Sequence, residues 1–252
     1  MKQGDFSELA ESYIHRTGYS HKVIQELTRR VMVNDESTTA DVGAGTGKLT
    51  EDLIKLGFKG WAIEPNESMR KEGIRLLGNV PFLWLVGSAE ATGLPDACVD
   101  LVFMGSSFHW ADPERALPEF RRILRPAGVF IAMWNPRNIE CDPFHKEIED
   151  WIHAEIPHLN RLSSGSNRYT QHIESTLVKG GFFKNVVFME DTYKVEMSTD
   201  RYLGAWQSVN DIRSQAGEEK FQKILNHIAD KVGDRSSINV PYKTRAWMVQ
   251  AT

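Results

Sequence analysis

Three glycines at alternate positions, Gly43, Gly45 and Gly47, constrain the fold of this chain more than any other sequence feature. They follow a short β-prone stretch at residues 39–42 and precede a helical pattern. Glycine permits a sharp turn and lets the backbone approach a ligand closely, and the following helix offers unpaired N–H groups and the positive end of its dipole. Glu64 ends the next predicted strand, where a carboxylate accepts hydrogen bonds from ribose hydroxyls. These features predict an α/β domain that binds a nucleotide-like ligand.

Strands and helices are expected to alternate as far as Trp134, which is typical of a parallel sheet with helices on both faces. Residues 6–33 are expected to form two short helices that separate near Gly18. The predicted strands lie at residues 39–42, 60–63, 82–86, 99–104 and 129–134, and the predicted helices at 46–56, 66–77 and 113–124.

The alternation stops after Trp134. Helices are predicted at residues 142–156 and 173–179, strands at 186–197 and 245–250, and a helical excursion at 199–232, with a polar, serine-rich stretch at 162–169. The excursion cannot join the sheet, so we expect it to cover the carboxyl ends of the strands, where ligands bind.

The predicted architecture is one α/β domain over residues 1–252, with a Rossmann-like, seven-stranded, mostly parallel sheet, helices on both faces and a helical cover. Its expected parts are an N-terminal helical cap (1–33), a cofactor-binding core (34–135), a substrate cover (136–185 and 198–244) and a terminal strand pair (186–197 and 245–252).

Composition narrows the class of partner. The chain has 252 residues, of which 41% are hydrophobic, as in a globular protein with a sizeable core. A net charge of −4 and the lack of a basic stripe argue against a nucleic-acid partner. Because no apolar run reaches membrane-spanning length and the first residues do not form a secretion signal, we expect a cytoplasmic protein with no membrane partner. Monomer and homodimer both stay open.

Cysteine and histidine patterns do not predict a metal site. Cys98 and Cys141 form no CxxC pair. His145, His153 and His158 share one stretch, but their spacing does not place them on one helix face.

Five segments in order carry a family resemblance. They are Asp41-Val-Gly-Ala-Gly-Thr-Gly, Ile63-Glu-Pro-Asn-Glu-Ser-Met, Gly87-Ser-Ala-Glu with Leu94-Pro95, Ser106-Ser-Phe-His-Trp-Ala-Asp and Leu124-Arg-Pro-Ala-Gly-Val-Phe. With them the chain resembles the class I S-adenosylmethionine-dependent methyltransferases, most closely the small-molecule branch with trans-aconitate and ubiquinone/menaquinone methyltransferases. The resemblance spans residues 8–135 and extends more loosely to the end.

The resemblance implies S-adenosyl-L-methionine as the cofactor. Glu64 would hold both ribose hydroxyls, and Arg16, in the N-terminal cap, would pair with the cofactor carboxylate. Residues implied at the methionine moiety are Asp41, Gly43 and Gly45, and those implied around the adenine are Asn66, Met69, Ser88, Ala89 and Glu90. Ala44 is also implied in the cofactor site. A soft thioether such as Met69 packs well on a flat ring.

Methyl transfer from a sulfonium is an in-line displacement, in which positioning of the acceptor supplies ~7–11 kcal/mol. A general base is needed only where the acceptor must lose a proton. His109 is the candidate for that base or for orienting the substrate; alternatively it orders its loop by a hydrogen bond to Asp112.

Several side chains are candidates for the acceptor pocket. Tyr13 lies in the predicted cap; Trp110 either stacks on substrate or packs, and Trp134 either walls the pocket or joins the core. Three arginines, Arg137, Arg168 and Arg213, lie in the predicted cover. A guanidinium there would suit a carboxylate acceptor, although each arginine taken singly is more commonly a solvated surface residue.

Other functions fit parts of the same pattern. A nicotinamide-dependent oxidoreductase is disfavoured because Gly47 follows Gly45 by two positions rather than three. A non-catalytic S-adenosylmethionine-binding protein and a peptide or protein methyltransferase stay open as alternatives. Whether oxygen, nitrogen or carbon is methylated also stays open.

Overall fold

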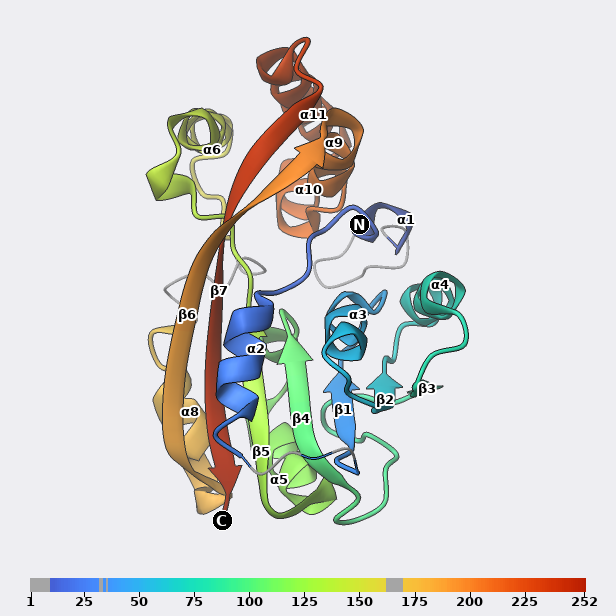
Figure 1. The fold of residues 1–252 in the computed structure, drawn as a ribbon. Coiled ribbons are helices and arrows are strands. Elements are labelled where there is room, and N and C mark those ends of the chain that lie inside the picture. Colours follow the sequence, from blue (N-terminus) through green and yellow to red (C-terminus); the bar gives the residue numbers. More distant parts are fainter. Residues whose placement is uncertain (1–9, 32–33, 35, 162–169) are drawn as a thin grey trace.

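A computed structural model describes residues 10–31, 34, 36–161 and 170–252 (Figure 1). The described part contains a seven-stranded sheet in the order β3-β2-β1-β4-β5-β7-β6. The strands are β1 (Thr39–Val42), β2 (Gly60–Ile63), β3 (Phe82–Leu85), β4 (Val99–Gly105), β5 (Leu124–Trp134), β6 (Phe183–Ser198) and β7 (Ser237–Ala251). The strands β1 to β5 pair in parallel, whereas β7 runs antiparallel to β5 and β6. The predicted fold class is confirmed.

Helices lie beside the sheet and beyond its carboxyl end (Figure 1). The α-helices are α1 (Ala10–Tyr13), α2 (His21–Thr28), α3 (Lys48–Lys55), α4 (Glu67–Leu77), α5 (Pro113–Ile123), α6 (Pro143–Glu155), α8 (Ile173–Val178), α9 (Thr199–Gln207), α10 (Asn210–Ala216) and α11 (Glu218–Val232). Three short 3₁₀ helices are η1 (Phe108–Trp110), η2 (Ile139–Cys141) and η3 (Lys179–Gly181).

The core has two layers, one on each face of the sheet. Successive side chains of a strand point to opposite faces, and β5 shows this clearly. Phe130 and Trp134 join the apolar cluster under α5 and α8, whereas Ile131 and Met133 join the cluster under α2 and α3. Because both faces are covered, β5 is buried continuously from residue 129 to residue 134.

A third apolar cluster forms the cover. It joins α6, α9, α10 and α11 to the ends of β6 and β7 that project past the other strands (Figure 1). Its members include Ile148, Tyr202, Trp206, Ile228 and Val240. The projecting strand pair therefore carries the helices over the carboxyl ends of the parallel strands.

The prediction for the last strand is wrong at its start. β7 begins at Ser237 rather than at residue 245, so residues 237–244, assigned to the helical cover, are strand. β6 likewise begins at Phe183 rather than at 186. Pro241 suggests a strand break because proline has no backbone N–H to donate to the hydrogen bonds between strands. Here β5 pairs with β7 only from Arg245 onward, and the Pro241 carbonyl faces the open side, where it accepts from the Asn138 N–H.

Other boundaries differ less. Residues 125–128, predicted as a turn, belong to the irregular first part of β5, where its register with β4 shifts. The serine-rich stretch at residues 162–169 lies outside the described residues. Most core helices begin within two residues of the expected position, and Asn66 and Asp112 each cap one by accepting a backbone N–H.

Candidate cofactor and acceptor site

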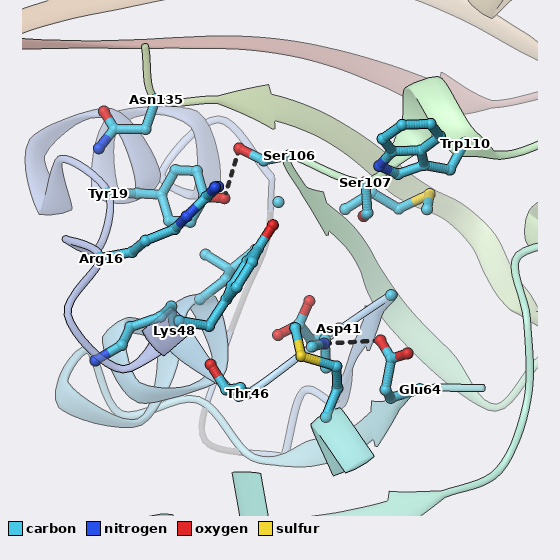
Figure 2. Close-up of a pocket in the computed structure, with 18 of the residues that line it drawn as sticks. Arg16, Tyr19, Asp41, Thr46, Lys48, Glu64, Ser106, Ser107, Trp110 and Asn135 are labelled. Carbon is cyan, nitrogen blue, oxygen red and sulfur yellow. Dashed lines mark hydrogen bonds between the residues drawn. The ribbon is translucent and has the colours of Figure 1, made fainter. Parts of the chain in front are cut away.

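A cavity of about 360 Å³ opens at the carboxyl ends of the parallel strands, between the sheet and the cover (Figure 2). This volume is in the range of ligand pockets. Its wall is formed by Tyr13, Arg16, Thr17, Tyr19, Asp41, Gly43, Ala44, Gly45, Thr46, Lys48, Leu49, Glu64, Pro65, Asn66, Met69, Ser88, Ala89, Glu90, Met104, Gly105, Ser106, Ser107, Trp110, Ala111, Asn135, Pro136, Arg137, Arg161, Ala205, Val209 and Tyr242.

The glycine-rich loop needs its glycines for conformation and for space. Gly43 and Gly45 have φ angles of 70° and 59°, and Gly47, which precedes α3, has a φ of 82°. A Cβ atom on Gly43 would lie 2.8 Å from the Ser107 side chain. Larger residues would therefore strain the turn and displace the loop after β4.

Glu64 ties the loop after β1 to the loop after β2. Its Oε2 accepts the Gly45 N–H at 2.8 Å (Figure 2). Its Oε1 accepts the Asn66 N–H at 2.8 Å. Burial raises the pKa of the carboxyl group, with these two hydrogen bonds acting in the opposite direction. The carboxylate is thus fixed at the cavity wall, and each oxygen has further lone pairs for ligand hydroxyls.

Asp41 is fully buried at the end of β1. Its Oδ2 accepts the Thr50 hydroxyl at 2.6 Å, whereas its Oδ1 has no hydrogen-bond partner among the described residues. Burial raises the pKa of Asp41 to about 7. A buried acceptor without a partner is costly, so this oxygen suits a ligand that brings a donor or a positive charge.

The predicted adenine side is built around the start of α4. Met69 is 4% exposed, and its Cε would lie 3.4 Å from a Cβ added to Gly45. Asn66 caps the helix by accepting the Met69 N–H at 3.1 Å. Across the cavity wall, Glu90 accepts the Asp112 N–H at 2.8 Å. All the residues assigned to the cofactor in the sequence line this one cavity, although their individual roles stay predictions.

Residues 14–20, here named the N-terminal strap, cross the cavity between core and cover. Arg16 donates from Nε to the Ser208 hydroxyl at 2.8 Å and from Nη2 to the Ser208 carbonyl at 2.9 Å, and it lies over the Tyr13 ring. Tyr19 donates its hydroxyl to Ser106 Oγ at 2.9 Å (Figure 2). Tyr13 and Arg16 thus lie at the cavity, as predicted.

His109 and Trp134 do not line the cavity in the described structure, which corrects their expected places there. Trp134 is 1% exposed because its side chain points to the α5 face of the sheet, and its Nε1 donates to His109 Nδ1 at 3.2 Å. Burial lowers the pKa of His109 to about 4. Asp112, the alternative partner weighed for His109, accepts the Glu114 N–H instead. Trp110, 39% exposed, does line the cavity.

The three predicted arginines differ in whether they line the cavity. Arg137 lines the cavity, with its guanidinium carbon 3.9 Å from the centre of the Trp206 ring. Arg213 pairs with Glu218 at 2.7 Å outside the cavity wall, and Arg168 lies outside the described residues. Arg161, which the sequence did not single out, lines the cavity and pairs with Glu149 at 2.9 Å.

Other wall residues also escaped the sequence analysis. Tyr19, Ser106 and Tyr242 come from the strap, the end of β4 and the projecting part of β7. Ser106 has a φ of 51°, unusual for a residue with a side chain. The position of Ser106 and Asn135 just past two strands was the available signal, whereas nothing local marks Tyr242.

Metal binding and membrane spanning are two further properties on which the structure bears. Within the described ranges, no three histidine, cysteine, aspartate or glutamate side chains gather so that they could hold a metal ion. No helix among the described residues has both the length and the apolarity needed to cross a bilayer.

Comparisons with known proteins agree with the geometry. Residues 40–132 match the family described as "Methyltransferase domain". An uncharacterized methyltransferase of Mycobacterium tuberculosis is 41% identical over 99 residues, which cover 39% of this chain and 40% of that relative. The match thus spans well under half of that curated relative.

Longer matches extend the similarity. An uncharacterized methyltransferase-like protein of Schizosaccharomyces pombe is 31% identical over 248 residues, covering 96% of this chain and 93% of the relative. A trans-aconitate 2-methyltransferase of Azoarcus sp. is 30% identical over 139 residues, covering 54% and 53%.

The fold is also found among solved structures. A putative type II methyltransferase from Anaeromyxobacter dehalogenans superposes with a TM-score of 0.63 at 21% identity, covering 94% of this chain and 97% of that one. The chain belongs to the class I methyltransferase family.

Proposed function

We propose that this protein binds S-adenosyl-L-methionine and transfers its methyl group to a small-molecule acceptor. The single observation that carries the proposal is the convergence of three features on one cavity. They are the left-handed glycine loop, the Glu64 carboxylate fixed between two loops, and the buried Asp41 oxygen without a partner. The cavity continues from these groups to residues of the strap and the cover.

The residues present fit such a cofactor. Glu64 holds two backbone N–H groups and still offers lone pairs to the two ribose hydroxyls. The Asp41 Oδ1 offers an acceptor to an ammonium group, and Met69 offers an apolar surface to the adenine. The Arg16 side chain donates to the neutral Ser208 and forms no ion pair among the described residues, so it suits the cofactor carboxylate.

The bound cofactor would supply an electrophilic methyl group, so the protein's main contribution is position. Residues of the strap and the cover lie along the cavity wall, and Tyr19, Ser106 and Asn135 hold one side of it through hydrogen bonds. Orientation of this kind supplies a large part of the barrier reduction, ~7–11 kcal/mol. No side chain has to act as a strong base for that contribution.

The lining of the cavity supports a small acceptor over a protein chain. The wall includes Ala205, Val209 and Tyr242 from the cover and the projecting strand, so the cover contributes to the cavity as well as the sheet. The similarity to a relative named trans-aconitate 2-methyltransferase is consistent with a small acceptor.

Calorimetry with S-adenosylhomocysteine, with NADH as the competing cofactor, tests the proposal. We expect binding of the first and none of the second. Glu64→Gln should weaken the affinity by about 10- to 100-fold, because an amide replaces a charged acceptor of several hydrogen bonds. Glu67→Gln is the matched control, since Glu67 is exposed on α4 and pairs only with Lys71.

Two results would overturn the proposal. One is the absence of binding heat for S-adenosylhomocysteine. The other is equal affinity in the wild type and Glu64→Gln, which would remove the assigned role of this carboxylate. Transfer of label from S-adenosylmethionine to a panel of acidic, phenolic and amine metabolites then tests the reaction itself.

A further inference from the structure

Among the described residues, three arginines line the cavity, and their charges are compensated differently. Arg161 pairs with Glu149 at 2.9 Å and lies 3.5 Å from Asp211, so two carboxylates offset its charge. Arg16 donates only to the neutral Ser208 in the described structure. Arg137 has neither an ion pair nor a side-chain hydrogen bond to a described residue, and its Nε is buried without a partner.

Aromatic rings hold the Arg137 guanidinium in place. Its central carbon lies 3.9 Å from the centroid of Trp206 and 5.8 Å from that of Tyr202, both on α9. Stacking of this kind fixes a guanidinium without neutralising its charge. Nearby carboxylates do not reach it, because Asp142 pairs with His145 and Glu149 pairs with Arg161.

Further buried polar atoms surround this cation. Tyr202 and Trp206 are 0% and 1% exposed, and apart from a contact between these two side chains neither the Tyr202 hydroxyl nor the Trp206 Nε1 has a hydrogen-bond partner among the described residues. His145 packs against Tyr202 with ring centroids 5.7 Å apart, and its Nε2 is likewise unpartnered. The group contains three donors, Arg137 Nε, Tyr202 Oη and Trp206 Nε1, and a buried donor left unpaired is costly.

We infer that Arg137, with Trp206 and Tyr202 behind it, forms a subsite that binds a carboxylate group of the methyl acceptor. Arg137 reaches the cavity at the wall shared with Ala205, Val209 and Tyr242, on the side of the cover. The planar, forked guanidinium matches the two oxygens of a carboxylate. The uncompensated charge of one arginine balances one carboxylate, which favours this group over a phosphate dianion.

This inference rests on the proposed function, because it names the class of acceptor for the same cavity. It assigns the subsite to anchoring and not to chemistry, so the carboxylate bound by Arg137 need not be the group that receives the methyl. Arg137 is thus a specificity residue, and its loss should affect acceptor binding while it leaves cofactor binding intact.

The test is calorimetry on the protein saturated with S-adenosylhomocysteine, at constant ionic strength. The probes are succinate, tricarballylate and benzoate, their matched primary amides, and inorganic phosphate. We expect at least one carboxylate to bind and its amide not to bind. Arg137→Gln should weaken that carboxylate by about 10- to 100-fold, the loss of a charged hydrogen-bonded pair, with unchanged affinity for S-adenosylhomocysteine.

Two further variants sharpen the test. Arg137→Lys keeps the charge but loses the fork, so an intermediate loss is expected. Arg213→Gln is the matched control, because Arg213 pairs with Glu218 away from the cavity wall, and it should bind the carboxylate as the wild type does.

The possible outcomes separate the two proposals. The inference alone is overturned if S-adenosylhomocysteine binds but none of the carboxylates does, if the amides or phosphate bind better than the carboxylates, or if Arg137→Gln binds like the wild type. Absence of S-adenosylhomocysteine binding in the wild type overturns the proposed function and the inference with it.

Discussion

The two halves of the cavity are built in different ways. On the cofactor side, Glu64 accepts backbone N–H groups from Gly45 and Asn66, so short loops after adjacent strands hold one another. On the acceptor side, Arg137 follows β5 but is positioned by Trp206 and Tyr202 from α9. The first half is formed by short loops of the core that one buried side chain ties together, and the second consists of side chains that are distant in sequence.

This difference separates two tasks. Hydrogen bonds from the backbone N–H groups of two neighbouring loops to the Glu64 carboxylate fix the shape of the cofactor half. A site formed by side chains of the cover changes with single substitutions while the sheet stays intact. The architecture therefore lets one cofactor half serve different acceptors, which agrees with function depending on grafted sites more than on fold.

The largest expected effect concerns a charge in the cofactor half. The pKa of Asp41 is raised by burial to about 7, above its unfolded value of 3.8. Stability from the protonated carboxyl group is therefore fully present below about pH 4 and is lost as the pH rises through about 7. We expect this group to lower the free energy of unfolding by about 3 kcal/mol between pH 5 and pH 8.

Urea unfolding of the wild type and of Asp41→Asn across this pH range measures the effect as the difference between the two curves. The asparagine keeps the shape and can still accept from Thr50, but it does not titrate. Parallel curves would show that Asp41 is already ionised at pH 5. The two halves should also differ in how ligand binding depends on pH. S-adenosylhomocysteine binding should change near neutral pH, where Asp41 titrates. Carboxylate binding to Arg137 should not change, since arginine stays charged.

The sequence predicts the residues of the cofactor half well and those of the acceptor half poorly. The reason is how far apart in the sequence the residues of each half lie. Gly43, Glu64 and Met69 lie in local patterns in which strand, turn and helix follow one another, and those patterns position them. Arg161 and Tyr242 reach the cavity only through the packing of α6, α10 and the projecting end of β7. The sequence predicts that His109 and Trp134 follow strands at the carboxyl end of the sheet. Whether such a side chain points to the cavity or to one face of the sheet depends on packing that the local sequence does not show.

An intermediate effect is expected for the strap, which contacts both halves. The buried Asp52 of α3 accepts the Tyr19 N–H at 2.6 Å and contacts His21 Nε2 at 2.9 Å, while Arg16 binds the cover through Ser208. Asp52→Asn would turn an amide N–H toward one of these donors. Loss of such a hydrogen bond should weaken S-adenosylhomocysteine binding by about tenfold.

Calorimetry of Asp52→Asn beside Lys55→Gln checks this expectation, because Lys55 is exposed on the same helix, pairs with Glu51 and does not line the cavity. A strap that closes both halves should also weaken carboxylate binding in Asp52→Asn. If only cofactor binding changes, the strap belongs to the cofactor half alone, and if neither changes, its tie to α3 is not needed for binding.

The smallest effect is expected for His109, which lies behind the acceptor wall. Its Nδ1 accepts the Trp134 indole N–H, and its pKa of about 4 keeps the ring neutral and a poor proton acceptor near pH 7. A general base contributes about 10²–10⁴-fold when it acts, so that role and a packing role differ widely in outcome.

We expect His109→Gln to keep kcat/KM for an accepted carboxylate within about threefold, although buried changes of this kind cost about 0.5–3 kcal/mol of stability. Trp110→Ala, at the cavity wall itself, should lower kcat/KM further than His109→Gln. A hundredfold loss in His109→Gln with normal folding would instead indicate that His109 takes part in the reaction. The acceptor half would then include residues that do not line the cavity.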